Sequence, residues 1–346
     1  PASGPPPGWT PGTGWTPPSI PLDALPVAAR PSLPVVETDY VQFFRAPRFR
    51  WWKPLLAVLG GGAVWLILLI ILSVVGIAID GWDDLVAPDG TPRVGPGMFL
   101  VNNLWLAAGI PIAMLTAWAV LGQRPGWLSS VAGGFRWSWF ARCCVIVLPI
   151  WAVLIGTGYY LGSLDQPIEL RWFDYTVFMI ITILVTTPLQ SAGEEYVVRG
   201  LLARCVGAYF ANPWVAFGAA TVVSSGVFMV LHGAQDPWLN VYYVVFAVVS
   251  SWLVWRTGGL EASIAIHVIN NVLSMVTVPF SDFSDMFDRS AGTGDPTILA
   301  NMAVLVGTAV LIDWIARRRG VVRLAAPGRE QLASVQSAVA RGVRPA

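Results

Sequence analysis

Charged residues are scarce in this chain, and this scarcity is the first indication of its class. Only 12% of the 346 residues are Asp, Glu, Lys or Arg, whereas 55% are hydrophobic. A soluble domain of this length would need far more charge on its surface, so the composition excludes one. The formal net charge is only +1, so the charge balance gives no indication of a nucleic-acid partner.

Cysteine is scarce too, and the motifs of common soluble hydrolases are missing. Cys143, Cys144 and Cys205 form neither a disulfide framework nor a CxxC metal site, and we expect them to be small buried residues. The sequence contains no HExxH zinc helix and no GxSxG nucleophile elbow. Its first residues are proline-rich rather than basic and then apolar, so no cleavable signal peptide is predicted.

Apolar stretches of about 20 residues recur along the chain, and this is the length that crosses a bilayer. They predict an all-α polytopic membrane protein with about eight transmembrane helices. The predicted spans are residues 55–79, 99–121, 140–161, 173–210, 214–232, 238–255, 260–278 and 298–315. The fourth span is too long for one straight crossing, and we expect Pro188 or Gly193 to kink it.

Basic residues gather on one set of loops, and aspartates gather on the other. The basic set flanks the first, second, sixth and eighth spans and comprises Arg45, Arg48, Arg50, Lys53, Arg124, Arg136, Arg256 and residues 317–319. By the positive-inside rule, this asymmetry predicts an integral protein of the plasma (inner) membrane with both termini cytoplasmic. The aromatic residues beside the first basic cluster are typical of an interfacial belt, namely Phe43, Phe44, Trp51 and Trp52.

The composition divides the chain into three parts. Residues 1–40 are rich in Pro and Gly, so we predict a disordered cytoplasmic tail, which leaves room for an unknown partner. Residues 41–320 are expected to form the membrane bundle, in contact with the lipid bilayer. Residues 321–346 are expected to be a cytoplasmic C-terminal tail that is partly helical.

Ionisable side chains inside apolar spans are costly, by roughly 2–3 kcal/mol even on lenient insertion scales, and usually mark function. Glu194, Glu195 and Arg199 interrupt the fourth predicted span. The chain has only two histidines, His232 and His267, and both fall in apolar spans. These residues are therefore the first candidates for a site.

Helical spacing assigns different positions to these side chains. Glu194 and Glu195 diverge by about 100° around a helix, so they cannot play the same role. Arg199 is four residues after Glu195 and can pair with it, which leaves Glu194 to face a cavity. His267 and Asn271 are also four apart and share one face.

Two chemistries are open to this set of residues. Antiparallel helices joined at residues 212–213 would place Glu194 and His232 at similar height, where they can hold and deprotonate a water. His267 and Asn271 can then donate hydrogen bonds to the developing oxyanion. In the alternative, Glu194, His232 and His267 bind Zn²⁺, which accepts mixed nitrogen and oxygen ligands.

Three motifs in this order resemble the CPBP family, which comprises the CAAX prenyl endopeptidases and their bacterial relatives, also called Abi proteins. They are Glu194-Glu195-x-x-x-Arg199, Phe228-x-x-x-His232 and His267-x-x-x-Asn271. The resemblance covers residues 173–278 and implies a four-helix catalytic core made of the fourth to seventh helices. Val198 departs from the pattern, because relatives often carry an aromatic residue before the arginine.

The resemblance implies an intramembrane endopeptidase that cleaves a membrane-associated or lipidated peptide or protein. It implies that Glu194 activates the water with the help of His232, and that His267 and Asn271 stabilise the oxyanion. Glu195 and Arg199 would support the first motif. The family is often described as metalloproteases, and a metal-free glutamate mechanism has also been argued, so the use of Zn²⁺ stays open. Prenylated C-terminal tetrapeptides are the substrates of the eukaryotic relatives, but nothing in this sequence specifies a prenyl pocket.

Other interpretations compete with this one. Residues 292–295 match the GxGD pattern of intramembrane aspartyl proteases, but they lie in an acidic loop, with Asp174 at a helix edge as the obvious partner. A transporter would more often show inverted repeats, and none is visible. The remaining alternative is a non-catalytic membrane scaffold or a bacteriocin-immunity or regulatory protein that uses the same polar residues structurally.

Overall fold

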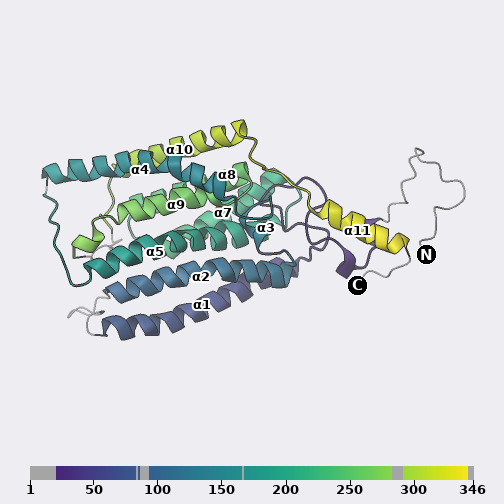
Figure 1. The fold of residues 1–346 in the computed structure, drawn as a ribbon, viewed down its shortest axis with the longest axis horizontal. Helices are drawn as coiled ribbons and strands as arrows, with labels where there is room; N and C mark the ends of the chain where they lie inside the picture. The colour runs from purple at the N-terminus through teal and green to yellow at the C-terminus, as the bar shows by residue number, and fades with distance from the viewer. Residues whose placement is uncertain (1–20, 83–84, 86–92, 166, 283–290, 342–346) are drawn as a thin grey trace, which may run out of the picture.

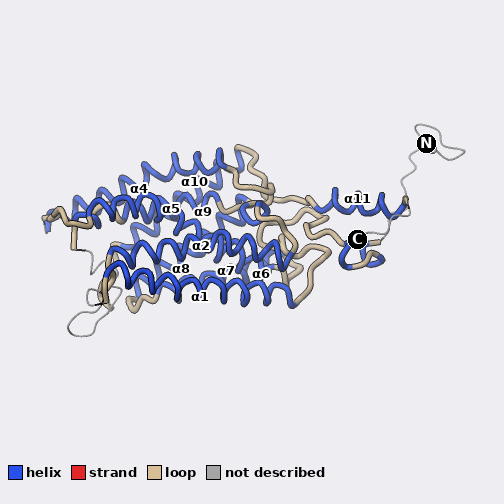
Figure 2. Tube along the Cα trace, turned by 60° about the horizontal axis from the view of Figure 1, so that its bottom comes forward, coloured by secondary structure: helices blue, strands red, loops and turns tan. Residues whose placement is uncertain are grey.

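The computed structural model describes the whole chain except residues 1–20, 83–84, 86–92, 166, 283–290 and 342–346. The described residues form helices and two isolated β-bridges, with no strand among them. Most of the helices run side by side along the long axis of the molecule (Figure 1). Figure 2 shows the same bundle from a second direction, with helices throughout. The all-α class predicted from the sequence is therefore confirmed.

Eight helical segments of the described chain are long and apolar enough to cross a membrane, which confirms the predicted number. They are α1 (Trp52–Asp80), α2 (Pro96–Leu121), α4 (Trp137–Asp165), α5 (Thr176–Glu195) with its continuation, α7 (Pro213–His232), α8 (Pro237–Thr257), α9 (Glu261–Ser274) with its continuation to Phe280, and α10 (Ile298–Arg318). The short helices are η1 (Leu22–Ala24), η2 (Val27–Ala29), α3 (Gly126–Ser129), η4 (Val278–Phe280) and α11 (Gly328–Ala340). Since α11 lies in the C-terminal tail, the expectation of a partly helical tail is also confirmed.

The fourth span departs from regular α-helix after Glu195. Its α5 part is followed by a π-helical segment, η3 (Tyr196–Leu202), and then by α6 (Ala203–Gly207). Pro188 lies inside α5, which continues through it. A Cβ on Gly193 would lie 1.9 Å from the backbone oxygen of Leu106. The glycine therefore permits close approach of α2 to α5, and the irregularity in the span is the π-helical segment that follows it.

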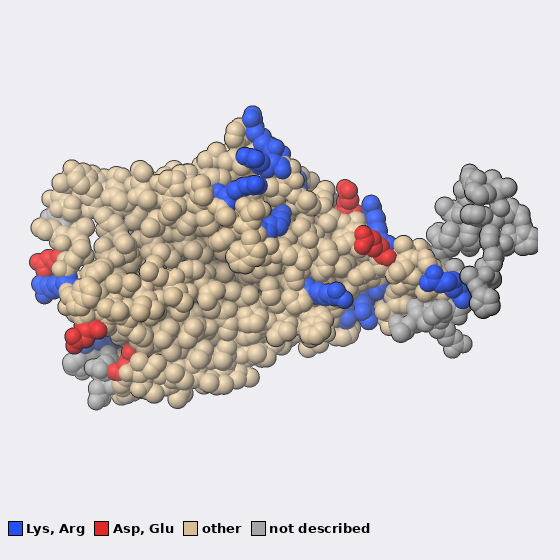
Figure 3. Space-filling view, in the orientation of Figure 1, with Lys and Arg blue, Asp and Glu red and all other residues tan. Residues whose placement is uncertain are grey.

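Charge divides the molecule into two ends, which we call the basic end and the acidic end. The basic end carries the described parts of both tails and the connections α2–α4, α6–α7 and α8–α9 (Figures 1 and 3). Its exposed or loop cations include Arg45, Arg48, Arg50, Lys53, Arg124 and residues 317–319. The acidic end carries the other four connections, with Asp80, Glu169, Asp174, Asp236, Asp282 and Asp295 against Arg93 and Arg171. The long sides between the two ends are almost free of charged side chains on the face shown in Figure 3.

The part of residues 1–40 that the structure describes is packed, so the prediction of a disordered tail is wrong for residues 21–40. Leu25 and Leu33 are buried, and Tyr40 is fully enclosed. Thr38 exchanges backbone hydrogen bonds with Ala325 of the C-terminal tail. Burial of a few large apolar side chains stabilises this proline-rich segment. The prediction missed them because it was based on the average composition of residues 1–40. Residues 1–20 lie outside the described residues.

Residues 33–49, which we call the N-terminal arm, lie across the basic end of the bundle. Phe43 and Phe44 of the arm are buried in the core, so the expectation that they belong to an interfacial belt is wrong. Trp51 and Trp52 are 66% and 45% exposed, as a belt requires. The Gln42 side chain donates to the backbone oxygens of residues 210 and 211, so the arm is tied to the turn before α7.

Candidate active site

A cavity of about 530 Å³ lies between the helices and contains four of the predicted site residues, Glu194, His232, His267 and Asn271. Further polar lining comes from Asn102, Asn103, Gln190, Tyr242, Tyr243, Asn270, Ser274 and Asn301. The rest of the wall is aromatic or aliphatic, and includes Trp65, Phe99, Trp105, Trp151 and Phe246. A concave apolar space with a few convergent polar groups has the size and character of a ligand site.

Glu195 lies behind the cavity as the centre of a buried polar cluster. Its Oε1 accepts from Arg199 Nη1 at 3.0 Å and from His267 Nδ1 at 2.9 Å. Its Oε2 accepts from the hydroxyl of Ser263 at 2.6 Å. The pairing of Glu195 with Arg199 that the spacing predicted is present. Because both carboxylate oxygens are bonded and the side chain is fully enclosed, Glu195 holds other groups in place.

Glu194, the residue before Glu195 in α5, has a different environment, because its side chain lines the cavity. Its Oε1 accepts from the Gln190 amide, whereas Oε2 is buried and has no hydrogen-bond partner among the described residues. The same Oε2 lies 3.6 Å from Nε2 of His267. A buried carboxylate oxygen without a partner is costly, so this atom is a natural position for a water or a substrate proton.

His232 is the last residue of α7, and local sequence sets where that helix starts and stops. Asn212 caps the start by accepting from the backbone of residues 214 and 215, and Gly233 ends the helix in the left-handed conformation with φ 62°. The His232 Nδ1 lies 2.8 Å from the backbone oxygen of Phe228. Since a carbonyl can only accept, Nδ1 carries the proton, and the neutral ring has its basic nitrogen at Nε2.

Aromatic rings hold the His232 imidazole in place. Its centroid lies 4.3 Å from that of Phe228 and 4.2 Å from that of Tyr243. Phe228 also stacks under the buried guanidinium of Arg199, at 4.4 Å. The second motif is therefore in contact with the first through one phenylalanine ring, which belongs to the predicted Phe228-x-x-x-His232 pattern.

The Asn271 amide is oriented by its neighbours. Its Nδ2 donates to Gln190 Oε1 at 3.3 Å and to the Ser191 hydroxyl at 3.2 Å. Its Oδ1 accepts from Asn270 at 3.0 Å. These contacts place the Asn271 donors beside Glu194 in the same cavity.

Asn270 bonds neighbouring helices. Its Oδ1 accepts from Trp151 Nε1 of α4 at 3.2 Å and from the Tyr242 hydroxyl of α8 at 3.1 Å. It also lines the cavity, a role that sequence reasoning missed.

Sequence reasoning also missed Gln190, Ser191 and Ser263, which bond the predicted residues directly. A signal for two of them exists in the spacing. Gln190 is four residues before Glu194, which it bonds on the same helix face. Ser263 is four residues before His267, so the two share a face of α9, and both bond Glu195 of α5.

The residues are only partly arranged for a metal. His267 has the pattern of a metal-binding imidazole, because Nδ1 bonds a carboxylate while Nε2 faces Glu194. Within the described part of the chain, however, no group of three or more His, Cys, Asp or Glu side chains is placed to hold a metal ion. Whether the site uses a metal is therefore a question for experiment.

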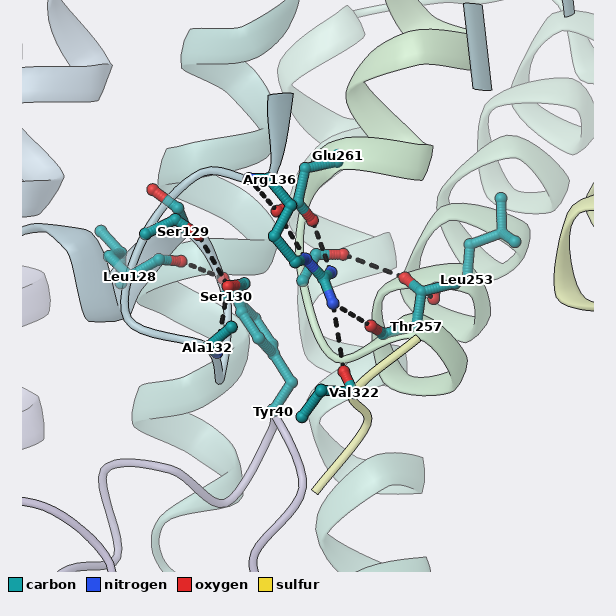
Figure 4. A network of polar contacts seen from close by, with 12 residues as sticks. Tyr40, Leu128, Ser129, Ser130, Ala132, Arg136, Leu253, Thr257, Glu261 and Val322 are labelled. Atoms are coloured by element: carbon teal, nitrogen blue, oxygen red, sulfur yellow. Dashed lines mark hydrogen bonds and ion pairs between the residues drawn. The ribbon is translucent and has the colours of Figure 1, made fainter. Parts of the chain in front are cut away.

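A second buried network fixes the start of α9, the helix that carries His267 and Asn271 (Figure 4). The Arg136 guanidinium contacts both oxygens of Glu261, at 2.8 Å through Nε and 2.6 Å through Nη2. It also donates to the backbone oxygens of Thr257 and Val322. The network thus joins α9 to the loop before α4, to the end of α8 and to the C-terminal tail.

Comparisons with known proteins match the same region. Residues 174–273 match the model of the family described as type II CAAX prenyl endopeptidase Rce1-like. The uncharacterised protein YyaK of Bacillus subtilis (strain 168) is 28% identical over 102 residues, which are 28% of this chain. The match covers 33% of YyaK, so this chain spans about a third of the length of that relative. No solved structure gives a significant match.

Proposed function

We propose that this chain, whose residues 174–273 belong to the Rce1-like type II CAAX prenyl endopeptidase family, is an intramembrane endopeptidase. The proposed reaction is hydrolysis of a peptide bond in a membrane-associated or lipidated peptide. The cavity supports this proposal because it brings a carboxylate, two imidazoles and an amide together inside a bundle of membrane-crossing helices.

The observation that carries the proposal is the unpartnered Oε2 of Glu194, which is buried 3.6 Å from Nε2 of His267. A water bound at this oxygen would lose a proton to it as the water oxygen attacks the peptide carbonyl carbon. The basic Nε2 of His232 is the second group that can accept or return a proton. The proton then passes to the leaving nitrogen as the C–N bond breaks, and a carboxylic acid and an amine are released.

The oxyanion that forms during attack needs donors. Asn271 Nδ2 donates to Gln190 and Ser191 in the free protein and can redirect one N–H to the substrate oxygen. When the His267 ring is doubly protonated, Nε2 donates on the Glu194 side of the cavity while Nδ1 keeps its bond to Glu195. In this assignment Glu195, Arg199 and Ser263 are positioning residues.

The test is cleavage in membranes by the full chain and its variants. We expect Glu194→Ala or His232→Ala to abolish cleavage while the protein still inserts, because each removes a group that moves a proton. Glu169→Gln is the matched control, since Glu169 is an exposed carboxylate that pairs only with exposed Arg171 among the described residues. Comparing the peptides of wild-type and Glu194→Ala membranes identifies the substrate at the same time. Unchanged turnover in either active-site variant would defeat the assignment and favour the scaffold or immunity alternative.

Metal dependence is tested separately by dialysis of the active protein against a chelator, followed by addition of Zn²⁺. Loss and recovery of cleavage would support a metal held by Glu194, His232 and His267. Full activity after dialysis, with the metal content measured, would support the mechanism that uses side chains alone.

A further inference from the structure

The catalytic cavity is not placed symmetrically between the two ends of the bundle. We propose that it is entered from the acidic end, which faces away from the cytoplasm, and that the substrate is an uncharged, apolar peptide segment presented from the outer half of the membrane. That the bound segment is a substrate rests on the proposed function. The route of entry is inferred from the cavity lining and the distribution of charge alone.

The first observation is which parts of the helices line the cavity. At the acidic end it reaches Phe99 in the first turn of α2, Leu239 in the first turn of α8 and Ile298 at the start of α10. His232, at the end of α7, lies at the same end. The lining therefore extends from Glu194 to helix ends whose connections carry the acidic residues.

The second observation is what lies between the cavity and the basic end. A layer of large side chains with exposures of 0 to 4% fills this space, namely Tyr40, Phe43, Leu128, Tyr196 and Leu260. The Tyr40 hydroxyl donates to the backbone oxygen of Leu128, and Tyr196 shares a hydrogen bond with Ser129 at 2.6 Å. The N-terminal arm and α3 thus close the basic end, and a substrate could pass only if this layer unfolded.

The third observation is the orientation that the charges impose. Cytoplasmic loops of membrane proteins carry the excess of Lys and Arg, and the basic end has nearly all of the described cations. Among the described loop and helix-end residues, the acidic end carries more carboxylates than cations, because Arg93 and Arg171 are its only arginines. The end of the bundle to which the cavity lining extends is therefore the non-cytoplasmic end.

The lining also limits the chemistry of the segment that fits. Among the described lining residues, Glu194 is the only carboxylate, and there is no Lys or Arg. The other ionisable side chains are the two histidines and the phenols of Tyr242 and Tyr243. Apolar walls and the side-chain amides of Asn102, Asn270 and Asn301 suit an extended, uncharged peptide whose backbone needs hydrogen bonds.

Accessibility to a membrane-impermeant thiol reagent tests the inference without any need for activity. The three native cysteines are replaced by alanine in the full chain, and single cysteines are introduced as Asn102→Cys or Asn301→Cys, two exposed lining positions. Trp82→Cys reports the acidic end, and Arg319→Cys reports the basic end, because both positions are exposed. A cationic methanethiosulfonate is applied to right-side-out and to inverted membrane vesicles.

We expect both cavity cysteines to be modified in right-side-out vesicles together with Trp82→Cys, and to react at least tenfold more slowly in inverted vesicles, where Arg319→Cys reacts. Modification of the cavity positions together with Arg319→Cys, or from neither side, would overturn the route of entry. Reaction of Trp82→Cys in inverted vesicles and of Arg319→Cys in right-side-out vesicles would overturn the proposed orientation in the membrane. Loss of cleavage in Glu194→Ala is a separate readout, so failure of the proposed reaction is distinguishable from failure of this inference.

Discussion

His267 Nδ1 lies 2.9 Å from Oε1 of Glu195, and this contact gives two adjacent glutamates separate environments. Glu195 is saturated by Arg199, Ser263 and His267, while Glu194 keeps an oxygen without a partner. The neighbouring carboxylates therefore differ in what they can do, although the sequence repeats the same residue type.

Substitution of each glutamate should separate stability from activity. Glu195→Ala leaves the buried Arg199 charge uncompensated, and breaking such a pair costs about 3–5 kcal/mol in unfolding free energy. Glu194→Gln removes no ion pair with arginine and should leave the free energy of unfolding within about 1 kcal/mol of wild type. Thermal unfolding in detergent measures both. Equal destabilisation by the two substitutions would contradict the division of roles.

Arg136 should be more important for stability than other arginines at the basic end. Arg136→Ala leaves Glu261 buried without its partner, so we expect a loss of about 3–5 kcal/mol. Arg136→Lys should recover only part of this, because one ammonium cannot reproduce the planar contacts of the guanidinium. Arg317→Ala is the control, since Arg317 is 61% exposed in its pair with Asp313 and should cost about 0–1 kcal/mol. Similar unfolding midpoints for Arg136→Ala and Arg317→Ala would argue against the network of Figure 4 as a support for α9.

Asp236 should give the acidic end a pH-dependent stability. The backbone N–H of Leu239, and with it those of Gly292 and Trp238, lowers the pKa of the Asp236 carboxyl below its usual value. A lowered pKa in the folded state contributes stability above the unfolded-state pKa of about 3.9, and this contribution is lost as the pH falls through the folded-state value.

Asp236→Asn is the matched variant for this prediction, because asparagine also caps a helix but does not ionise. The variant should be less stable than wild type at pH 7, and the difference should shrink as the pH falls below about 4. Unfolding midpoints measured from pH 7 to pH 3 check this. A difference that is constant over that range would show that the charge of Asp236 contributes nothing.

The N-terminal arm should hold the basic end closed through Tyr40. Tyr40→Ala removes an enclosed ring, and large-to-small substitution of an aromatic core residue costs about 3–5 kcal/mol. Tyr40→Phe keeps the ring, removes the hydroxyl that donates to Leu128 and should cost about 1 kcal/mol. Proteolysis of the arm in detergent, followed over time, should be accelerated in Tyr40→Ala and little changed in Tyr40→Phe. Resistance of both variants would mean that the arm is held elsewhere.

Hydropathy was sufficient to predict the eight spans, because the bilayer demands long apolar helices wherever the chain crosses it. The Glu195–Arg199 pair followed from helical spacing in the same way. The contact between Glu195 and His267 could not be predicted, since it depends on how α5 packs against α9. The packed residues 21–40 were missed because average composition hides a few well-placed large side chains.

The π-helical segment Tyr196–Leu202 lies between α5, which carries Glu194, and α6, which carries Arg204. It changes the directions in which the side chains of α6 point relative to those of α5. A π turn holds more residues than an α turn, so the side chains after it point where an unbroken α-helix would not carry them. If one residue were deleted there, Arg204 would swing by about 100° away from the Tyr40 ring, which it now covers at 3.5 Å, while Glu194 stayed in place. A change of length in this segment would therefore rotate the side chains at the basic end and leave the Glu194 carboxylate in its place in the cavity.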